Sequence, residues 1–577
     1  MHQMNAFFFW ASWAAITERP GSEVTYTHNW PADDLIGNKA TGDLIIWTGF
    51  SIILLLFGIG IMIFYHARMK EEDEPEMPRE DPLMRQTLTP SMLAVKKYLW
   101  VVSLLILIQV TFGVLTAHYG VEGDAFYGLD LAEILPYSIS RTWHVQLGIL
   151  WIATAWLATG LYIAPAVSGK DPRFQRFGVN FLFICLLIIV LGSMAGQWMG
   201  IMQKLGLTEN FWFGHQGYEY VDLGRFWQIF LLVGLFVWLA LMVRPLIPVL
   251  KSKTSEKNLL IMFLVSSAAI ALFYGAGLMW GRQTNLAIAE YWRWWVVHLW
   301  VEGFFEVFAT VVSAFLFVRL GLLRTRTATL SVLLATIIFL SGGIVGTFHH
   351  LYFSGTPTAV MALGATFSAL EVVPLVLIGY EVYENYKLSR ATEWIKDYKW
   401  PIYCLIAVAF WNFLGAGIFG FVINPPIALY YMQGLNTTAV HAHTALFGVY
   451  GMLGIGLMLF VLRSLYRSQV WNDKLLRFSF WSINIGLLLM VVLSILPVGL
   501  LQTVASVNHG MWYARSAEFM QQPGMDTLRW LRVVGDSIFA VGLIAFVWFV
   551  FSLNSSKKVT EDKKQASRIR SFRKRAA

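Results

Sequence analysis

The sequence contains few charged residues. Only 14% of its 577 residues are Asp, Glu, Lys or Arg, whereas 57% are hydrophobic. Soluble domains carry about a quarter charged residues, so this composition excludes an ordinary soluble protein and indicates an integral membrane protein in a lipid bilayer. The net charge of +8 does not indicate a nucleic-acid partner, because the basic residues lie in alternate loops and in the carboxyl-terminal tail.

Cysteine is almost absent. Cys185 and Cys404 both lie in apolar segments, so we expect two buried, inert thiols and no disulfide framework. The sequence has no C-x-x-C-H motif, which excludes covalently attached haem c. It also lacks a basic amino-terminal region followed by a small-residue cleavage site, so no signal peptide is predicted.

Long apolar runs dominate the rest of the chain, and each is about long enough to cross ~30 Å of hydrocarbon. They predict an all-α membrane protein with about 13 transmembrane helices and no evident internal repeat. The predicted spans are 44–68, 94–119, 140–165, 178–200, 225–246, 258–280, 291–318, 327–350, 358–384, 400–421, 439–462, 475–502 and 531–553.

The ends of the chain differ from this pattern. Residues 1–43 are turn-rich and are interpreted as the remnant of a soluble domain on the outer face. The span 44–68 is an extra transmembrane helix, followed by a polar loop over 69–93. Residues 94–553 form a twelve-helix core, and residues 554–577 form a basic tail.

Lys and Arg cluster in alternate loops, which sets the predicted orientation. One set of loops and the tail holds most of them, while the opposite set holds mainly Lys204, Arg282, Arg515 and Arg529. The basic set is therefore expected to be cytoplasmic, with the amino terminus outside and the carboxyl terminus inside a bacterial cytoplasmic membrane.

Six histidines from four spans fall at one predicted depth, in the outer third of the membrane: His144, His298, His349, His350, His441 and His443. Ionisable groups inside apolar spans are costly and indicate function. In a helix, His441 and His443 point about 200° apart, so each can ligate a different metal. Flat cofactors on either side of the helix, with haem the favoured cofactor, fit this pattern better than two core histidines bonded to carbonyls.

The six histidines divide by position. His298, His349 and His350 can converge on one metal, leaving His144 and His443 for one haem and His441 for another. Glu302 lies one turn after His298 and adds an oxygen donor, which suits non-haem iron better than copper; the alternative is a buried neutral acid. Glu306 and Glu371 are either proton-carrying acids or structural hydrogen bonders.

These motifs resemble the catalytic subunit of the haem–copper oxidase superfamily, and within it the nitric oxide reductases. The matching stretches are Trp143-His144, His298-x-x-x-Glu302, Gly346-Thr-Phe-His349-His350 and His441-x-His443. Many oxygen-reducing relatives place a tyrosine where this sequence has Glu302, and copper in place of the non-haem iron.

The resemblance implies a set of cofactors and ligands. It assigns His144 and His443 to low-spin haem b and His441 to high-spin haem b3. Non-haem iron is assigned to His298, Glu302, His349 and His350. Glu306 and Glu371 match acids that hold the metal site and deliver protons, and Glu219 matches a glutamate that helps bind calcium near the haem propionates.

The extra span, the amino-terminal remnant and the absence of C-x-x-C-H resemble the quinol-dependent branch of this family. Its quinol site corresponds to His118, Glu122, Phe126 and Asp536. Relatives begin with a further membrane helix and a longer soluble domain, so the resemblance predicts a shortened chain.

The predicted function is therefore reduction of nitric oxide to nitrous oxide with electrons from membrane quinol. Two alternatives are a quinol-oxidising oxygen reductase of the same superfamily and a non-enzymatic haem-based gas-binding membrane protein. The second alternative does not explain a ligand set for another metal beside haem. The sequence sets no oligomeric state.

Overall fold

The computed structural model describes residues 2–69, 77–124, 128–253, 256–389 and 393–554. Apart from three isolated bridges, the secondary structure within these ranges is helical. Lipid offers no hydrogen bonds to the backbone, so apolar runs of this length satisfy their own N–H and C=O groups as helices. The described ranges contain 13 helices that are long and apolar enough to cross a membrane, which confirms the predicted fold class.

The first seven spans run from the amino terminus to the middle of the chain. They are α2 (Gly42–Met69), α3–α4 (Pro90–Ala94, Lys96–Glu122), α5 (Tyr137–Ser168), α6 (Gln175–Ile201), α8 (Arg225–Leu250), α9–η3 (Lys257–Tyr274, Gly275–Leu278) and α10–η4–α11 (Leu286–Trp294, Trp295–Phe304, Phe305–Arg319).

The remaining six spans complete the bundle. They are α12–η5–α13–η6 (Thr325–Ile338, Phe339–Gly343, Ile344–Gly346, Thr347–Ser354), α14–α15 (Thr358–Leu370, Val373–Ser389), η7–α16–η8–α17 (Glu393–Tyr398, Lys399–Trp411, Asn412–Phe419, Gly420–Val422), α19–η9–α20 (Asn436–Ala442, His443–Gly451, Met452–Leu465), α21–η10–α22 (Asp473–Met490, Val491–Ile495, Leu496–His509) and α25–α26 (Pro523–Trp530, Arg532–Ser552).

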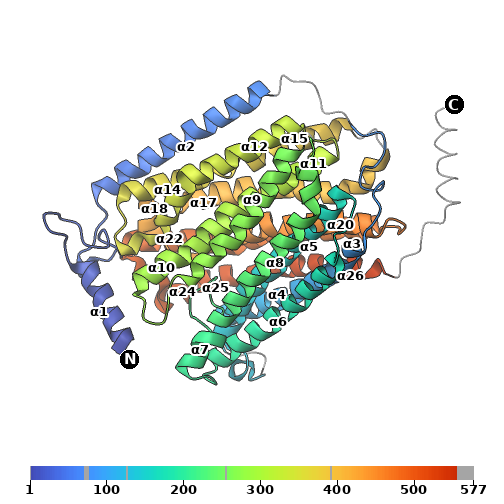
Figure 1. Ribbon diagram of the computed structural model, residues 1–577. Coiled ribbons are helices and arrows are strands. Elements are labelled where there is room, and N and C mark those ends of the chain that lie inside the picture. Colours follow the sequence, from blue (N-terminus) through green and yellow to red (C-terminus); the bar gives the residue numbers. More distant parts are fainter. Residues whose placement is uncertain (1, 70–76, 125–127, 254–255, 390–392, 555–577) are drawn as a thin grey trace.

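Shorter helices lie between or before the spans. They are α1 (His2–Ile16), η1 (Asp34–Ile36), η2 (Leu131–Glu133), α7 (Leu207–Phe213), α18 (Pro426–Met432), α23 (Met511–Arg515) and α24 (Ala517–Met520). The long helices run side by side as one bundle, with α2 along its edge next to α14 (Figure 1).

The spans differ in how deeply they are enclosed by the rest of the protein. The most hydrophobic window of the Leu286–Arg319 span is 93% buried, and those of Tyr137–Ser168 and Asn436–Leu465 are 83% buried, against 22% for Gly42–Arg68. The enclosed spans carry His144, His298 and the His441–His443 pair. The histidines therefore lie on helices at the centre of the bundle, away from lipid.

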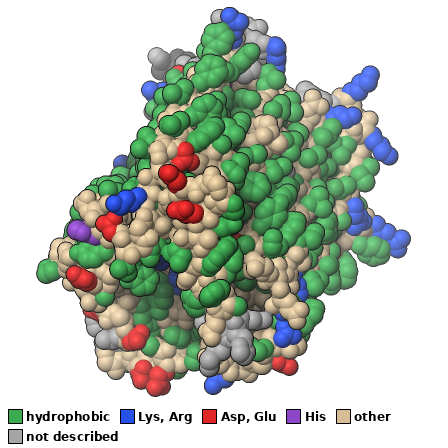
Figure 2. Space-filling model, turned by 90° about the vertical axis from the view of Figure 1, so that its left-hand side faces the viewer, with side chains coloured by type: hydrophobic (Ala, Val, Ile, Leu, Met, Phe, Trp, Pro, Cys, Tyr) green, Lys and Arg blue, Asp and Glu red, His purple; other side chains and the backbone are tan. Residues whose placement is uncertain are grey.

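The molecular surface also separates the charges. In Figure 2 most Lys and Arg side chains lie along the upper and right-hand edges of a broad apolar surface, and Asp and Glu gather toward the lower left. Such an apolar band between polar margins is the pattern of a protein that spans a bilayer.

Candidate metal centre

Three histidines from two spans converge on one point. His298 lies in η4, and His349 and His350 lie in η6; one ring nitrogen from each falls within 4.8 Å of the other two. His349 Nε2 lies 2.9 Å from His350 Nε2, which lies 3.2 Å from His298 Nδ1. Metal–imidazole bonds are about 2 Å long, so nitrogens on one ion stand about 3 Å apart. The cluster therefore fits a single metal ion.

Neighbouring residues restrict these rings. Trp294 stacks on His350, with the ring centroids 3.8 Å apart and the planes 4° from parallel. A Cβ built on Gly346 would lie 2.7 Å from His298 Nε2, so only glycine leaves room for that ring. His298 and His349 are almost fully buried, and a buried, pre-positioned cluster of imidazole nitrogens is suited to a metal.

The helix geometry at this cluster is not regular. The segment η4, which contains His298 and Glu302, is π-helical, and η6, which contains His349 and His350, is a 3₁₀-helix. Short π-helical segments are frequent at functional sites. The side chain of Glu302 lies outside the described residues, so its predicted role as an iron ligand stays a prediction.

A second group of histidines faces a different part of the bundle. The rings of His144 on α5 and His443 in η9 lie next to each other, tilted, with centroids 6.5 Å apart and planes 31° from parallel. Two imidazoles on opposite sides of one metal, with bonds of about 2 Å, have centroids roughly 6–6.5 Å apart. The pair therefore has the separation that two axial ligands of one haem need.

His441 points elsewhere. Its Nδ1 lies 3.0 Å from the carbonyl oxygen of Gly415 in η8, and a Cβ on Gly420 would lie 3.0 Å from its Cε1. His441 and His443 thus face different helices, as their two-residue spacing requires. Each can serve a separate cofactor.

The three predicted haem ligands share one hydrogen-bonding pattern. Nδ1 of His144 lies 3.1 Å from Gln109 O and also 3.1 Å from Gln109 Nε2, Nδ1 of His443 lies 2.8 Å from Ala439 O, and Nδ1 of His441 meets Gly415 O. A proton donated from Nδ1 to a carbonyl leaves Nε2 as the ligand nitrogen, which is the usual arrangement of metal-binding histidines. On this observation the residues fit axial ligation of haem.

Arg532 at the start of α26 is a residue that the sequence did not single out. Its Nη2 lies 3.2 Å from His443 Nε2, and its Nε donates to Asp536 Oδ2 at 2.9 Å. If His443 binds haem through Nε2, the guanidinium of Arg532 must move away from that nitrogen. The only sequence signal for Arg532 is its place four residues before Asp536 in an apolar span.

Two predicted acids lie deeper in the bundle. Glu306 on α11 and Glu371, between α14 and α15, are both buried. Asn412 Nδ2 donates to Glu306 Oε1 at 2.9 Å and to the carbonyl of Val372 at 3.1 Å, so one amide links the first acid to the residue after the second. The roles of both acids in holding the metal site and delivering protons stay predictions.

The predicted quinol residues occupy two helices that pack against each other, α4 and α26. On α4, His118 Nε2 lies 3.0 Å from Glu122 Oε2. On α26, Asp536 is bonded to Arg532. Phe126 lies outside the described residues. The contact between the two helices could not be predicted from the sequence, and the structure supplies it.

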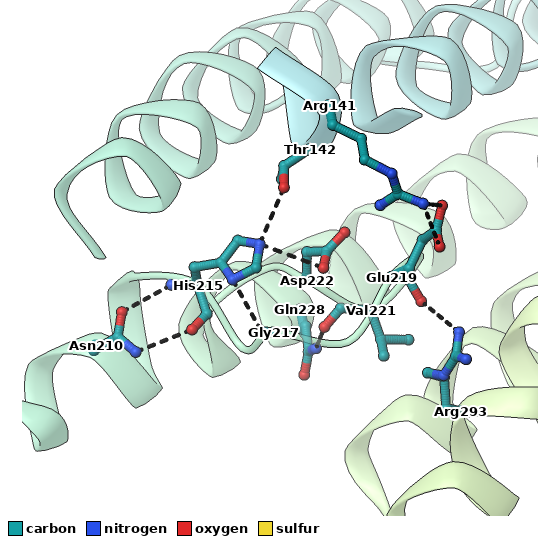
Figure 3. A network of polar contacts seen from close by, with 10 residues as sticks. All are labelled: Arg141, Thr142, Asn210, His215, Gly217, Glu219, Val221, Asp222, Gln228 and Arg293. Carbon is teal, nitrogen blue, oxygen red and sulfur yellow. Dashed lines mark hydrogen bonds and ion pairs between the residues drawn. The ribbon is translucent and has the colours of Figure 1, made fainter. Parts of the chain in front are cut away.

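Glu219 belongs to a polar network in the loop between α7 and α8 (Figure 3). Its carboxylate oxygens both lie 3.1 Å from Arg141 Nη2, and its carbonyl accepts from Arg293 Nη1 at 3.2 Å. Calcium takes six to eight oxygen ligands, whereas this carboxylate meets a guanidinium. The calcium site therefore stays a prediction from the resemblance.

The same loop holds a histidine–aspartate pair. His215 Nε2 lies 3.5 Å from Asp222 Oδ1. Burial raises the pKa of Asp222 to about 7, with the nearby Glu219 charge adding to the rise. Burial also lowers the pKa of His215 to about 4. Sequence reasoning missed this pair, which lies in a short polar loop.

The amino-terminal segment covers the end of the bundle that holds η6. Arg19 Nη2 donates to Gly355 O at 2.9 Å, Tyr430 Oη donates to Asn29 O at 2.9 Å, and Met511 N donates to Ala32 O at 3.0 Å. These hydrogen bonds hold the residues before the first span next to the end of η6.

Comparison with known proteins agrees with this architecture. A nitric oxide reductase subunit of Stutzerimonas stutzeri is 24% identical over 471 residues, which cover 79% of this chain and 94% of that protein. Residues 1–32 match a family described as the cytochrome c-like domain of a nitric oxide reductase subunit. Residues 93–538, most of the chain, match the family described as cytochrome c and quinol oxidase polypeptide I. The chain is a multi-span membrane oxidoreductase that belongs to this haem- and metal-binding family, the haem–copper oxidases.

Proposed function

We propose that the protein reduces nitric oxide with electrons from membrane quinol: two NO, two electrons and two protons give N2O and water. The observation that carries the proposal is the presence of a three-histidine ion cluster together with three histidines whose Nδ1 atoms meet backbone carbonyls. A haem-based gas sensor needs no set of ligands for a second metal. The similarity to a nitric oxide reductase subunit supports the choice of substrate.

The donor set also favours nitric oxide over dioxygen. Glu302 follows His298 by four residues, and a carboxylate beside three imidazoles suits non-haem iron better than copper. In this proposal His298, Glu302, His349 and His350 hold non-haem iron, His441 holds haem b3, and His144 and His443 hold haem b. When bound, haem b3 and the non-haem iron would supply the redox chemistry for coupling two NO molecules.

The chain's own acids move the protons. Glu306 and Glu371 are buried carboxylates, and Asn412 donates to Glu306 and to the carbonyl of Val372, the residue after Glu371. In this proposal they hold protons and pass them to the site.

Quinol oxidation releases two protons with two electrons, and a histidine with carboxylates suits their acceptance. His118 with Glu122 on α4, and Asp536 on the adjacent α26, form this site in the proposal, together with Phe126. Arg532 binds both Asp536 and His443, so the proposed quinol site lies next to a proposed haem ligand.

The proposal includes the orientation of the chain. Residues 1–43 and the histidine-bearing helix ends lie on the outer side of the bacterial membrane, and the Lys- and Arg-rich loops and the tail 554–577 lie in the cytoplasm. Glu219 is retained as a candidate calcium ligand next to the proposed haem propionates.

Metal analysis of purified protein tests the proposal. We expect two b-type haems, one non-haem iron and no stoichiometric copper. One copper per two haems would reject nitric oxide reduction and favour an oxygen reductase.

Replacement of Glu302 gives a sharper test of the same site. In Glu302→Ala, NO consumption should fall at least ten- to hundredfold with both haem spectra preserved, since loss of metal-site groups has effects of about this size. Glu306→Ala serves as the comparison and should retain more iron. A Glu302→Ala protein with full iron and near-normal turnover would remove Glu302 from the site.

A further inference from the structure

A groove opens onto the lipid-facing surface between α21 and α26. It is open to the surface, has a volume of about 380 Å³ and is lined by Lys474, Arg477, Phe478, Trp481, Ile485 and Ile538. We propose that it binds one phospholipid with an anionic headgroup, from the leaflet on the Lys- and Arg-rich side of the membrane. This site is separate from the proposed quinol site, which lies where α26 meets α4.

The groove has rigid walls because glycines hold the two helices in contact. A Cβ on Gly486 would lie 2.4 Å from Phe539 N, one on Gly535 would lie 2.2 Å from Met490 N, and one on Gly542 would lie 2.8 Å from Ile483 N. Ser479 Oγ also donates to Gly542 O at 2.8 Å. Backbones packed this closely cannot move apart without losing these contacts, so the groove is preformed.

The charge at one end of the groove selects an anion. Lys474 and Arg477 are exposed, lie three residues apart on one helical face, and are the charged residues among those that line the groove. Among the described residues neither cation forms an ion pair. The adjacent Asp473 accepts a hydrogen bond from Trp400 Nε1 at 2.6 Å. Basic pockets between transmembrane helices on this side of a membrane commonly bind anionic headgroups.

The length and the remaining lining fit an acyl chain. Lys474 and Ile485 are eleven residues apart, about 16 Å along a helix, which matches one leaflet of a hydrocarbon core ~30 Å thick. Below the cations, Phe478, Trp481 and Ile485 are exposed by 50%, 50% and 44%. The cations thus lie where a headgroup lies, and the apolar wall below them continues through one leaflet.

Lipid retention by the full-length purified protein tests this site. The protein is equilibrated with vesicles of equal phosphatidylglycerol and phosphatidylcholine, transferred to detergent, and its retained lipids are measured by mass spectrometry. Each basic residue near the surface favours anionic lipid by about fivefold. We expect wild type to retain phosphatidylglycerol in preference, and Lys474→Gln/Arg477→Gln to lose most of that preference.

Matched variants separate the groove from general surface charge. Lys251→Gln/Lys253→Gln removes the same charge from exposed positions at the end of α8 and should leave the preference intact. Ile485→Trp fills the groove and should reduce retention with both cations present, whereas Leu488→Trp, one turn along the same exposed side, should not. Haem content and elution volume report correct folding of each variant.

Three results would overturn the inference. Equal retention of the two lipids by wild type would remove the charge selection. Equal loss in the Lys251/Lys253 control would assign the preference to the whole basic face. If wild type retains quinone in place of phospholipid, and Ile485→Trp loses that quinone, the groove binds a quinone.

Discussion

The two groups of histidines differ in how far apart the structure holds their nitrogens. In the cluster of His298, His349 and His350, neighbouring nitrogens already lie about 3 Å apart, so a metal ion can enter with small ring rotations. The rings of His144 and His443 instead lie with centroids 6.5 Å apart, and Arg532 reaches the nitrogen of one ring. An ion needs only converging side chains, whereas a haem also needs volume between helices.

The difference predicts that each group can be disrupted without the other. His349→Ala removes one ligand from the ion cluster and touches no proposed haem ligand. We expect iron content to fall from one non-haem iron toward zero and NO consumption to fall more than about a hundredfold, with both haem spectra preserved. Metal analysis and optical spectra measure this.

His215→Ala is the matched control, because His215 is a partly buried histidine in the α7–α8 loop. It should leave non-haem iron unchanged. Loss of the low-spin haem spectrum in His349→Ala would show that the two histidine groups are not independent.

The next prediction concerns electron entry beside the proposed haem ligands His144 and His443. In His118→Ala and Asp536→Ala, quinol-driven NO consumption should fall about tenfold or more, because a proton acceptor is lost. Turnover with a small artificial reductant that feeds the haems directly should persist. An oxygen electrode adapted for NO measures both rates.

Glu133→Ala is the control for that experiment, since Glu133 is an exposed carboxylate in η2. Equal loss with both electron donors would indicate structural damage. No loss with either donor would place the quinol elsewhere.

Glycine substitutions sharpen the comparison further. A Cβ at Gly113 would lie 2.7 Å from His144 Cε1, and one at Gly346 would lie 2.7 Å from His298 Nε2. Gly113→Ala should therefore displace the ring of His144, a proposed haem ligand, and shift the low-spin haem spectrum. Gly346→Ala should lower iron content several-fold with that spectrum unchanged.

Gly120→Ala on the same helix as Gly113 is the control, because nothing lies within 4 Å of its added Cβ. It should change neither signal. A Gly113→Ala protein with an unaltered low-spin spectrum would argue against a haem at His144.

The sequence predicted the spans and the candidate ligands but not the contacts that hold them. Apolar runs of sufficient length require helices in lipid, so thirteen spans followed directly, and the spacing of His441 and His443 predicted that they face different neighbours. The contacts of Arg532 with His443 and of Gly113 with His144 join different spans. Such pairings depend on how the helices pack, which apolar periodicity does not encode.

Local helix geometry was also beyond the sequence. The π-helical turn that begins at His443 and the 3₁₀ turn around His349 and His350 depend on packing of neighbouring spans. The residues in these turns have no composition that marks them. The carbonyl partners of the three Nδ1 atoms follow from that same packing.

The smallest predicted effect concerns Asp222, in the loop between α7 and α8. Glu219 in this loop contacts Arg141 on the His144 helix and Arg293 just before η4, so the loop connects the two histidine regions. Buried Asp222 in this loop has its pKa raised from 3.8 to about 7. The folded protein therefore holds a proton that the unfolded chain releases above about pH 4. The stability from this group is complete below pH 4 and is lost as the pH rises toward 7.

Asp222→Asn keeps the shape of the side chain and removes the buried charge. The variant should melt roughly 2–4 °C above wild type at pH 8, where Asp222 is ionised, and this difference should shrink as the pH falls and disappear below about pH 4, where Asp222 is protonated in both the folded and the unfolded chain. His215, whose pKa falls from 6.5 to about 4, stabilises the fold increasingly as the pH rises between those values, so the melting temperature of the variant should rise more steeply between pH 5 and 7 than that of wild type.

Asp34→Asn, at an exposed aspartate, should give no pH-dependent difference. A variant that melts below wild type at pH 8 would mean that the ionised Asp222 carboxylate is paired with a cation in the folded protein.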